Sequence, residues 1–175
     1  MAAAALAACG LAQAGADEDA DFGVPPTREL RLADHAAPTP REVPGARTVR
    51  TAELGAWLQR AAPLRPVLLD VLGGEGHDSI PGAVWLPGAG RGQGYDDATQ
   101  ALLARTLAAL TGGEPRRALV FFCSGAQCWL SYNAALRAIV LGYREVHWYR
   151  GGIEAWVDAD GSLEPMRARW NLLPN

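Results

Sequence analysis

The feature that most limits the possible folds is an alternation of short apolar runs with helix-like segments, which begins near residue 47. Four apolar runs are typical of strands buried on both faces, and they cover residues 67–71, 82–86, 118–122 and 145–149. Helical spacing of apolar residues follows over about 96–110 and 131–141. Strands that alternate with helices form a parallel sheet with helices on both faces. The sequence therefore predicts an α/β fold in a single domain.

The composition excludes several classes of function. All 16 basic residues are arginine, and with 19 acidic residues they give a net charge of -3. The chain thus lacks the basic excess of nucleic-acid-binding proteins, and the absence of lysine excludes Schiff-base and P-loop lysine chemistry. The three cysteines are too few for a disulfide scaffold, and neither they nor the three histidines have metal-binding spacing. We expect no nucleic-acid partner, no metal and no cofactor.

The first 16 residues resemble a secretory signal peptide. They form an alanine-rich apolar run that ends in Ala14-Gly15-Ala16, which fits an A-x-A cleavage site. We predict that this segment is removed and that the mature protein is periplasmic or secreted, in an oxidising compartment. Two alternatives stay open: the segment is only a flexible tail, or residues 6–9 form a lipoprotein box in which Cys9 is lipidated. No other apolar run approaches the length of a membrane span.

Two further segments flank the predicted domain, which covers residues 47–158. Residues 17–46 contain several prolines, which break helices and central strands, so we expect an extended arm over the surface. Residues 159–175 form a short tail, in which Trp170 and Leu172 are available to pack against the domain.

The chemistry concentrates in the loop after the third predicted strand. This loop consists of Cys123, Ser124, Gly125, Ala126, Gln127, Cys128 and Trp129. Backbone N–H groups of the turn and the positive end of the following helix dipole favour a thiolate at Cys123. Because small side chains let the backbone curl toward that sulfur, the loop amides are able to hold a transferred anion. We predict that Cys123 is a nucleophile, and the alternative is a buried structural cysteine.

Cys128 leaves two interpretations open. It lies five residues after Cys123, and neighbouring thiols in an oxidising compartment often pair. We therefore consider a structural disulfide beside a reactive or resolving role for Cys128. Trp129 stands where a phosphatase loop needs an arginine, and the cysteines are too far apart for a thioredoxin motif. The loop belongs to neither of those classes.

Other positions near this edge of the sheet are weaker candidates. Asp70 ends the run 67–71 and is either a functional acid or a turn-capping one. Arg150 precedes a Gly-Gly pair and either binds an anionic substrate or partner or is a plain surface arginine. Trp129 either packs in the core or forms a pocket wall. The glycine-rich stretch 88–94 lacks the strand-to-helix context of a nucleotide loop, so we interpret it as a mobile surface loop.

The order of these segments resembles the rhodanese domain family. The resemblance is carried by LLDV at 68–71, SIPGAVWLP at 79–87, VFFCSGAQC at 120–128 and LGYREVHWYRGGIEAW at 141–156. It covers about residues 47–158 and implies a rhodanese-like fold, in which Cys123 carries sulfane sulfur as a persulfide. It also implies that the backbone of residues 124–128 cradles this sulfur, and that the partner is a small sulfur donor or a protein thiol.

A narrower resemblance is to exported rhodanese-like proteins with a paired-cysteine-plus-Trp motif, which accompany periplasmic PQQ-dependent alcohol catabolism. It is carried by TPREVPGARTVRTAEL at 39–54, TGGEPRRALVFFC at 111–123 and CWLSYNAALRA at 128–138, with four residues instead of three between the cysteines. Two hypotheses follow. In the first, a sulfurtransferase, Cys123 takes sulfur from a donor and Cys128 resolves the persulfide. In the second, a redox or accessory module of a quinoprotein dehydrogenase system, the cysteine pair switches between dithiol and disulfide without sulfur turnover.

Overall fold

The fold is built on a five-stranded parallel sheet. The computed structural model describes residues 18–62 and 64–169. In this part of the chain the strands are β1 (Arg47–Val49), β2 (Val67–Asp70), β3 (Asp78–Ser79), β4 (Val84–Trp85), β5 (Leu119–Phe122), β6 (Val146–Tyr149) and β7 (Glu164–Pro165). The sheet has the order β1-β6-β5-β2-β4, and every neighbouring pair is parallel. The predicted parallel sheet is confirmed, and β5 lies at its centre.

Two strands differ from the prediction. The sequence pattern does not predict β1, because three residues are too few to show a periodicity. Strand β4 keeps only two residues of the predicted run 82–86. Its start is limited by Gly82, whose φ of 79° lies outside the β region, and β4 is the edge strand of the sheet, beside β2.

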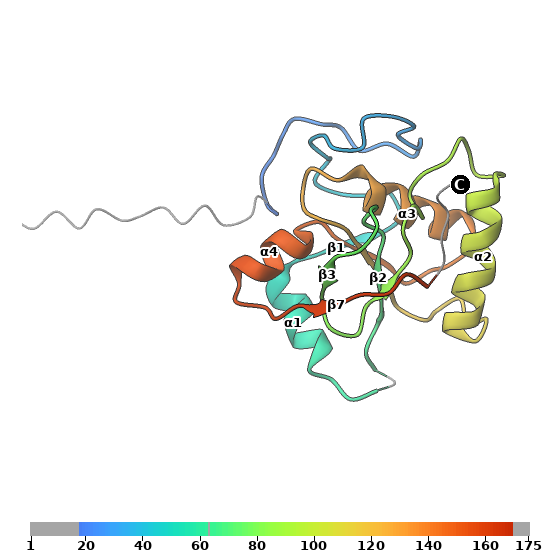
Figure 1. The fold of residues 1–175 in the computed structure, drawn as a ribbon. Coiled ribbons are helices and arrows are strands. Elements are labelled where there is room, and N and C mark those ends of the chain that lie inside the picture. Colours follow the sequence, from blue (N-terminus) through green and yellow to red (C-terminus); the bar gives the residue numbers. More distant parts are fainter. Residues whose placement is uncertain (1–17, 63, 170–175) are drawn as a thin grey trace, which may run out of the picture.

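Helices cover both faces of the sheet (Figure 1). Within the described residues they are α1 (Thr51–Leu58), α2 (Ala98–Thr111), α3 (Trp129–Val140) and α4 (Gly152–Asp158). Helices α2 and α3 share one core cluster with the sheet, which includes Leu103 and Phe121. Helices α1 and α4 share the other, which includes Leu54 and Phe122. Successive residues of β5 thus enter opposite clusters, as the pleat of a strand requires, and the predicted two-faced architecture is confirmed.

Residues 18–46 form an arm without a helix, which lies along α3 (Figure 1). Two side chains of α3 hold its backbone. The hydroxyl of Tyr132 accepts from the N–H of Thr27 and donates to its carbonyl, both at 2.8 Å. The amide of Asn133 accepts from the N–H of Arg31 at 3.0 Å and donates to its carbonyl at 2.8 Å. Each side chain therefore satisfies the backbone N–H and the backbone carbonyl of one arm residue, as a neighbouring strand would.

The chain after α4 returns to the domain. Strands β3 and β7 form a small antiparallel pair, and the N–H of Arg169 donates to the carbonyl of Trp85 at 2.9 Å. Trp170, Leu172 and the leader with Cys9 lie outside the described residues. Within 18–62 and 64–169, no helix combines the length and the apolar character needed to cross a membrane.

Candidate functional site

Cys123 lies directly after the central strand, at the carboxyl edge of the sheet. Its side chain is 1% exposed. The start of α4 holds the following backbone, because the N–H of Ile153 donates to the carbonyl of Cys123 at 3.0 Å and that of Glu154 to the carbonyl of Ser124 at 2.9 Å. Gly152 permits this approach: it has a φ of 60°, and a Cβ there would lie 2.3 Å from the Cys123 carbonyl oxygen. Only glycine fits this contact.

A disulfide joins Cys123 to Cys128, with the Cα atoms 6.4 Å apart. Cys128 is the residue immediately before α3, and its N–H donates to the carbonyl of Gly125 at 3.1 Å. The loop therefore curls back within one tight turn, which brings a strand end and a helix start within the reach of a disulfide. Both interpretations left open by the sequence, a structural disulfide and a reactive or resolving Cys128, are compatible with this bonded pair.

The backbone N–H groups of residues 124–127 form no hydrogen bond within the described part of the chain. Gln127 is exposed and Ser124 is half-buried. Gly125 and Ala126 are buried, and the carboxylate of Glu154 lies against Gly125, where a Cβ would be 2.1 Å from Oε2. An anion on the sulfur of Cys123 is the kind of group that such amides stabilise.

The arm crosses this loop and forms hydrogen bonds with it. The carbonyl of Ala126 accepts from the N–H and the hydroxyl of Thr39, at 3.2 and 2.7 Å. The N–H of Trp129 donates to the carbonyl of His35 at 2.9 Å, and its indole N–H donates to the carbonyl of Pro38 at 3.0 Å. The side chain of Trp129 is buried against the arm and the core, so of its two predicted roles the structure has the packing one.

Arg150 is buried beneath the arm. It is 1% exposed, and its guanidinium donates to the hydroxyl and the carbonyl of Thr39 and to the carbonyls of Glu18 and Ala20. The alternative of a plain surface arginine is therefore wrong, and the described partners of Arg150 belong to the arm. The arm passes over the end of β6, and the backbone carbonyls of the arm satisfy the charge.

Asp70 organises the loop after β2. Its carboxylate accepts from the N–H of Leu72 at 2.9 Å, from Nε2 of His77 at 2.6 Å and from the hydroxyl of Ser79. It is fully buried and pairs in register with Phe122, the residue before Cys123. These hydrogen bonds match the turn-capping role predicted for Asp70. By holding this loop, Asp70 shapes one side of the site.

A cavity of about 390 Å³ opens beside the disulfide. It is lined by His35, Ala36, Leu72, Gly73, Arg91, Ser124, Gln127, Cys128 and Leu130. Sequence reasoning missed His35 and Arg91, because they come from the arm and from the glycine-rich stretch and no local motif marks them. Burial lowers the pKa of His35; a hydrogen bond with the backbone of Arg31 partly opposes this effect, and the nearby charge of Arg91 adds to it.

The glycine-rich stretch 88–94 is only partly the surface loop that the sequence predicts, because residues 91–94 reach the surface and residues 88–90 do not. Its first residues are buried, and a Cβ on Gly90 would lie 1.9 Å from the carbonyl oxygen of Leu130 in α3. The side chain of Asn133 donates to the carbonyl of Gly90 at 2.8 Å, and Arg137 donates to that of Arg91 at 2.8 Å. Helix α3 thus holds the backbone that presents the Arg91 side chain.

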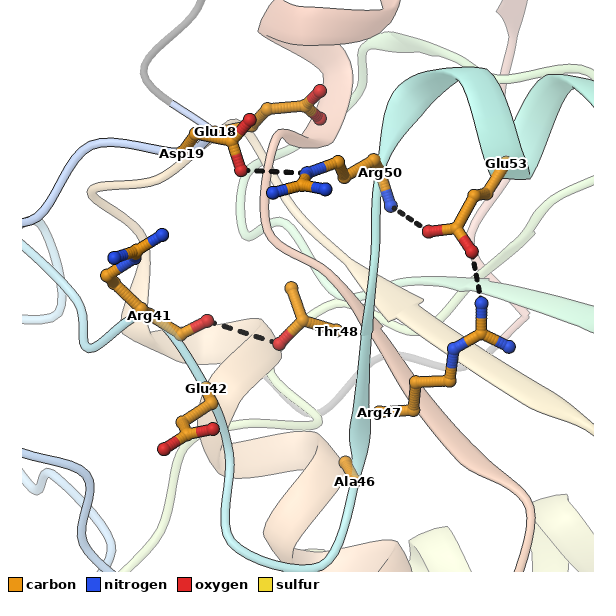
Figure 2. A pocket seen from close by; sticks show the side chains of 9 residues that line it. All are labelled: Glu18, Asp19, Arg41, Glu42, Ala46, Arg47, Thr48, Arg50 and Glu53. Carbon is orange, nitrogen blue, oxygen red and sulfur yellow. Dashed lines mark hydrogen bonds and ion pairs between the residues drawn. The ribbon is translucent and has the colours of Figure 1, made fainter.

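A larger cavity, of about 700 Å³, lies at the junction between the arm and β1 (Figure 2). Charged side chains line it, and four of them form ion pairs: Arg47 with Glu53, and Arg50 with Asp19 at 2.9 Å. None of its described lining residues belongs to the cysteine loop. We assign this cavity to the contact between arm and domain, and the candidate site to the cavity beside Cys128.

Comparison with known proteins identifies a family and a fold. A family model described as "Rhodanese-like domain" matches residues 51–159. No curated protein sequence matches the chain. Among solved structures, the chain is similar to a thiosulfate sulfurtransferase from Pseudomonas aeruginosa, with 24% identity and a TM-score of 0.51 over 71% of this chain and 21% of that one.

Two further solved structures show the same fold. A protein from Bacillus halodurans has 22% identity and a TM-score of 0.50 over 73% of this chain and 86% of that one. Wild-type EanB has 20% identity and a TM-score of 0.51 over 70% of this chain and 32% of that one. This chain therefore spans only about a fifth of the length of the sulfurtransferase and about a third of the length of EanB.

Proposed function

This chain belongs to the rhodanese-like domain family, and on that premise we propose that it carries sulfane sulfur on Cys123. The observation that supports this most strongly is the position of Cys123 after the central strand, next to four backbone N–H groups without a described acceptor. A parallel sheet binds ligands beyond the carboxyl ends of its strands. Amides directed at a sulfur favour its anionic, nucleophilic form.

The transfer begins from the reduced cysteine pair. The Cys123 thiolate attacks the outer sulfur of a donor such as thiosulfate and forms a sulfur–sulfur bond. The bond between that sulfur and the rest of the donor breaks, and sulfite leaves with the electron pair. Cys123 then holds a persulfide anion, which the amides of residues 124–127 stabilise.

Cys128 serves as the resolving thiol in this proposal. When no acceptor thiol takes the sulfur, the persulfide takes up one proton from solvent, and the Cys128 thiolate attacks Sγ of Cys123 and expels the outer sulfur as hydrosulfide. The product is the Cys123–Cys128 disulfide, the form present in the structure. The close approach of the two residues, at 6.4 Å between Cα atoms, supports this step.

The disulfide also favours a second candidate function. Here the domain is a redox or accessory module, in which the pair switches between dithiol and disulfide without sulfur turnover.

In either case we propose that the protein acts after export, in the periplasm or as a secreted protein, or as a lipoprotein through Cys9. The leader-like residues 1–16 support export, as do the paired cysteines, because disulfides persist in oxidising compartments. The paired cysteines followed by Trp129 support an association with a PQQ-dependent quinoprotein system.

Intact mass spectrometry of the reduced full chain tests sulfur transfer. The protein is reduced, freed of reductant and treated with thiosulfate or polysulfide. We expect Cys128→Ser to gain the mass of one sulfur atom, because its persulfide has no resolving thiol. The adduct is released by a thiol and is absent from Cys123→Ser, which keeps the neighbouring cysteine as a matched control.

The wild-type chain distinguishes the two candidate functions. Sulfur transfer predicts that the donor converts the reduced wild-type chain to its disulfide form and that hydrosulfide is released. If Cys128→Ser gains no sulfur while the wild type only loses two hydrogens to an oxidant, the redox module is correct and sulfur transfer is wrong.

A further inference from the structure

The two sulfurs of the disulfide are not equally placed. Cys128 is 6% exposed and lines the cavity of about 390 Å³, whereas Cys123 is 1% exposed and is not among its lining residues. Of the two cysteines, Cys128 is therefore the one that a molecule in this cavity contacts. In exchange reactions the accessible sulfur is the one attacked, and the other sulfur becomes the leaving group.

The cavity suits an anion. The side chain of Arg91 is exposed and makes no ion pair with any described residue. Nε2 of His35, on the arm side of the cavity, is buried and has no hydrogen-bond partner among the described residues. No carboxylate occurs among the described lining residues. The volume lies at the small end of ligand cavities, which selects a small molecule over a peptide.

The leaving sulfur is also favourably placed. If the disulfide opens at Cys128, the electron pair goes to Cys123, which directly precedes residues 124–127, whose amides donate to no described acceptor. These groups stabilise a thiolate, and a leaving thiol with a lower pKa departs faster. At the other sulfur, the arm already uses the first helical N–H of α3, since Trp129 donates to the carbonyl of His35.

We propose that Sγ of Cys128 is the electrophilic atom of the oxidised protein, and that a small anionic sulfur nucleophile held in the cavity by Arg91 attacks it. The nucleophile forms a sulfur–sulfur bond with Cys128, the Cys123–Cys128 bond breaks, and Cys123 leaves as a thiolate. The disulfide is the oxidant, so the step needs no other one. This inference rests on the proposed function, because it uses the same cysteine pair. The reaction differs in that it starts from the disulfide and not from the dithiol.

Sulfite is the probe for the test, because it opens disulfides and leaves one stable sulfonate. The oxidised full chain is treated with sulfite, and the released thiol is trapped with iodoacetamide. Fragment-ion mass spectrometry then locates each group. We expect the sulfonate on Cys128 and the alkyl group on Cys123; the reverse arrangement, or an even mixture, overturns the proposal.

Variants test the role of charge. Arg91→Gln should slow the reaction with sulfite by about fivefold, the effect of one nearby charge in a solvated site. It should not slow opening by a neutral phosphine. Arg105→Gln, on an exposed position of α2, is the matched control and should slow neither. An equal effect of Arg91→Gln on both reagents refutes anion binding, since it indicates only a changed loop.

The two proposals fail separately. Persulfide formation is measured on reduced protein, and sulfonate placement on oxidised protein. A sulfonate on Cys128 without any persulfide on Cys123 sustains this inference and refutes sulfur transfer. A persulfide on Cys123 with the sulfonate on Cys123 gives the opposite result.

Discussion

At the scale of single residues, a buried ion pair fixes the segment that carries Arg91. Arg137 is fully buried in α3, and its guanidinium binds the carboxylate of Asp97 at 2.9 Å and the carbonyls of Arg91 and Gly94. Asp97 also accepts from the N–H of Gln100 as the N-cap of α2. Burial by itself raises the pKa of Asp97, but the hydrogen bonds from Arg137 and from backbone N–H groups outweigh it and lower the pKa to about 2.

This lowered pKa predicts an acid-labile contribution to stability. The pKa of Asp97 rises from about 2 in the folded chain to near 3.8 in the unfolded one. Ionised Asp97 therefore stabilises the fold above about pH 4, and this stabilisation is lost as the pH falls toward about 2. Asp97→Asn should lower the free energy of unfolding at pH 7 by at least about 2 kcal/mol, and the difference from wild type should shrink toward pH 2.

Urea unfolding between pH 7 and pH 2 measures this difference. The matched control is Asp96→Asn, which changes the exposed neighbouring carboxylate. A difference between Asp97→Asn and wild type that stays constant with pH, or an equal loss in the control, contradicts the assignment.

At the scale of elements, the arm is the part that completes the site. It supplies His35 to the cavity and covers the cysteine loop through Thr39 and the backbone around it. Thr39 is fully buried; its hydroxyl donates to the carbonyl of Ala126 at 2.7 Å and accepts from Nε of Arg150 at 3.1 Å. One hydroxyl thus connects the arm to β6 and to the loop between the cysteines.

Thr39→Val tests this connection, because valine keeps the shape and removes both hydrogen bonds. It leaves a buried guanidinium N–H and a buried carbonyl with one partner fewer, so we expect a loss of about 1–3 kcal/mol in the free energy of unfolding. Hydrogen exchange at residues 35–39 should also accelerate, because the arm is held less firmly. Thr27→Val is the control: its hydroxyl makes only an exposed local bond with the N–H of Glu29. Equal exchange rates in the two variants would show that Thr39 does not hold the arm.

At the scale of the whole molecule, both redox states should share one fold. The core continues on both faces of the sheet, and the two sulfurs lie inside the cluster that α2 and α3 form with it. The disulfide closes a loop with a sequence separation of only 5. A short loop restricts the unfolded chain little, so the bond contributes only about 2 kcal/mol. Both candidate functions need this property, since each passes through a dithiol.

Reduction should therefore lower stability without unfolding the protein. We expect a neutral phosphine to lower the free energy of unfolding by about 2 kcal/mol and to leave one cooperative transition and an unchanged far-ultraviolet circular dichroism spectrum. The double variant Cys123→Ser/Cys128→Ser is the control and should not respond to the phosphine. Loss of the cooperative transition on reduction would mean that the disulfide holds the domain together, which favours a purely structural role.

Much of the fold follows from local patterns in the sequence. The apolar runs 67–71 and 118–122 become β2 and β5, because a strand buried on both faces needs apolar side chains at every position. The short strand β1 has no such signature and forms through its pairing with β6. The position of Cys123 after a buried strand is likewise a local fact, and it predicts a sulfur at the carboxyl edge of the sheet.

The sequence by itself determined the parallel sheet, its two layers of helices and the strand end that carries Cys123, because side-chain periodicity encodes each of these within a few residues. Only the tertiary structure decided that Arg150 is buried under the arm, that stretch 88–94 packs on α3, and that His35 and Arg91 meet beside Cys128. The physical reason is that these contacts join irregular segments far apart in the chain. Hydrogen bonds from single side chains to distant backbone carbonyls hold them, and such bonds leave no periodic trace in the sequence.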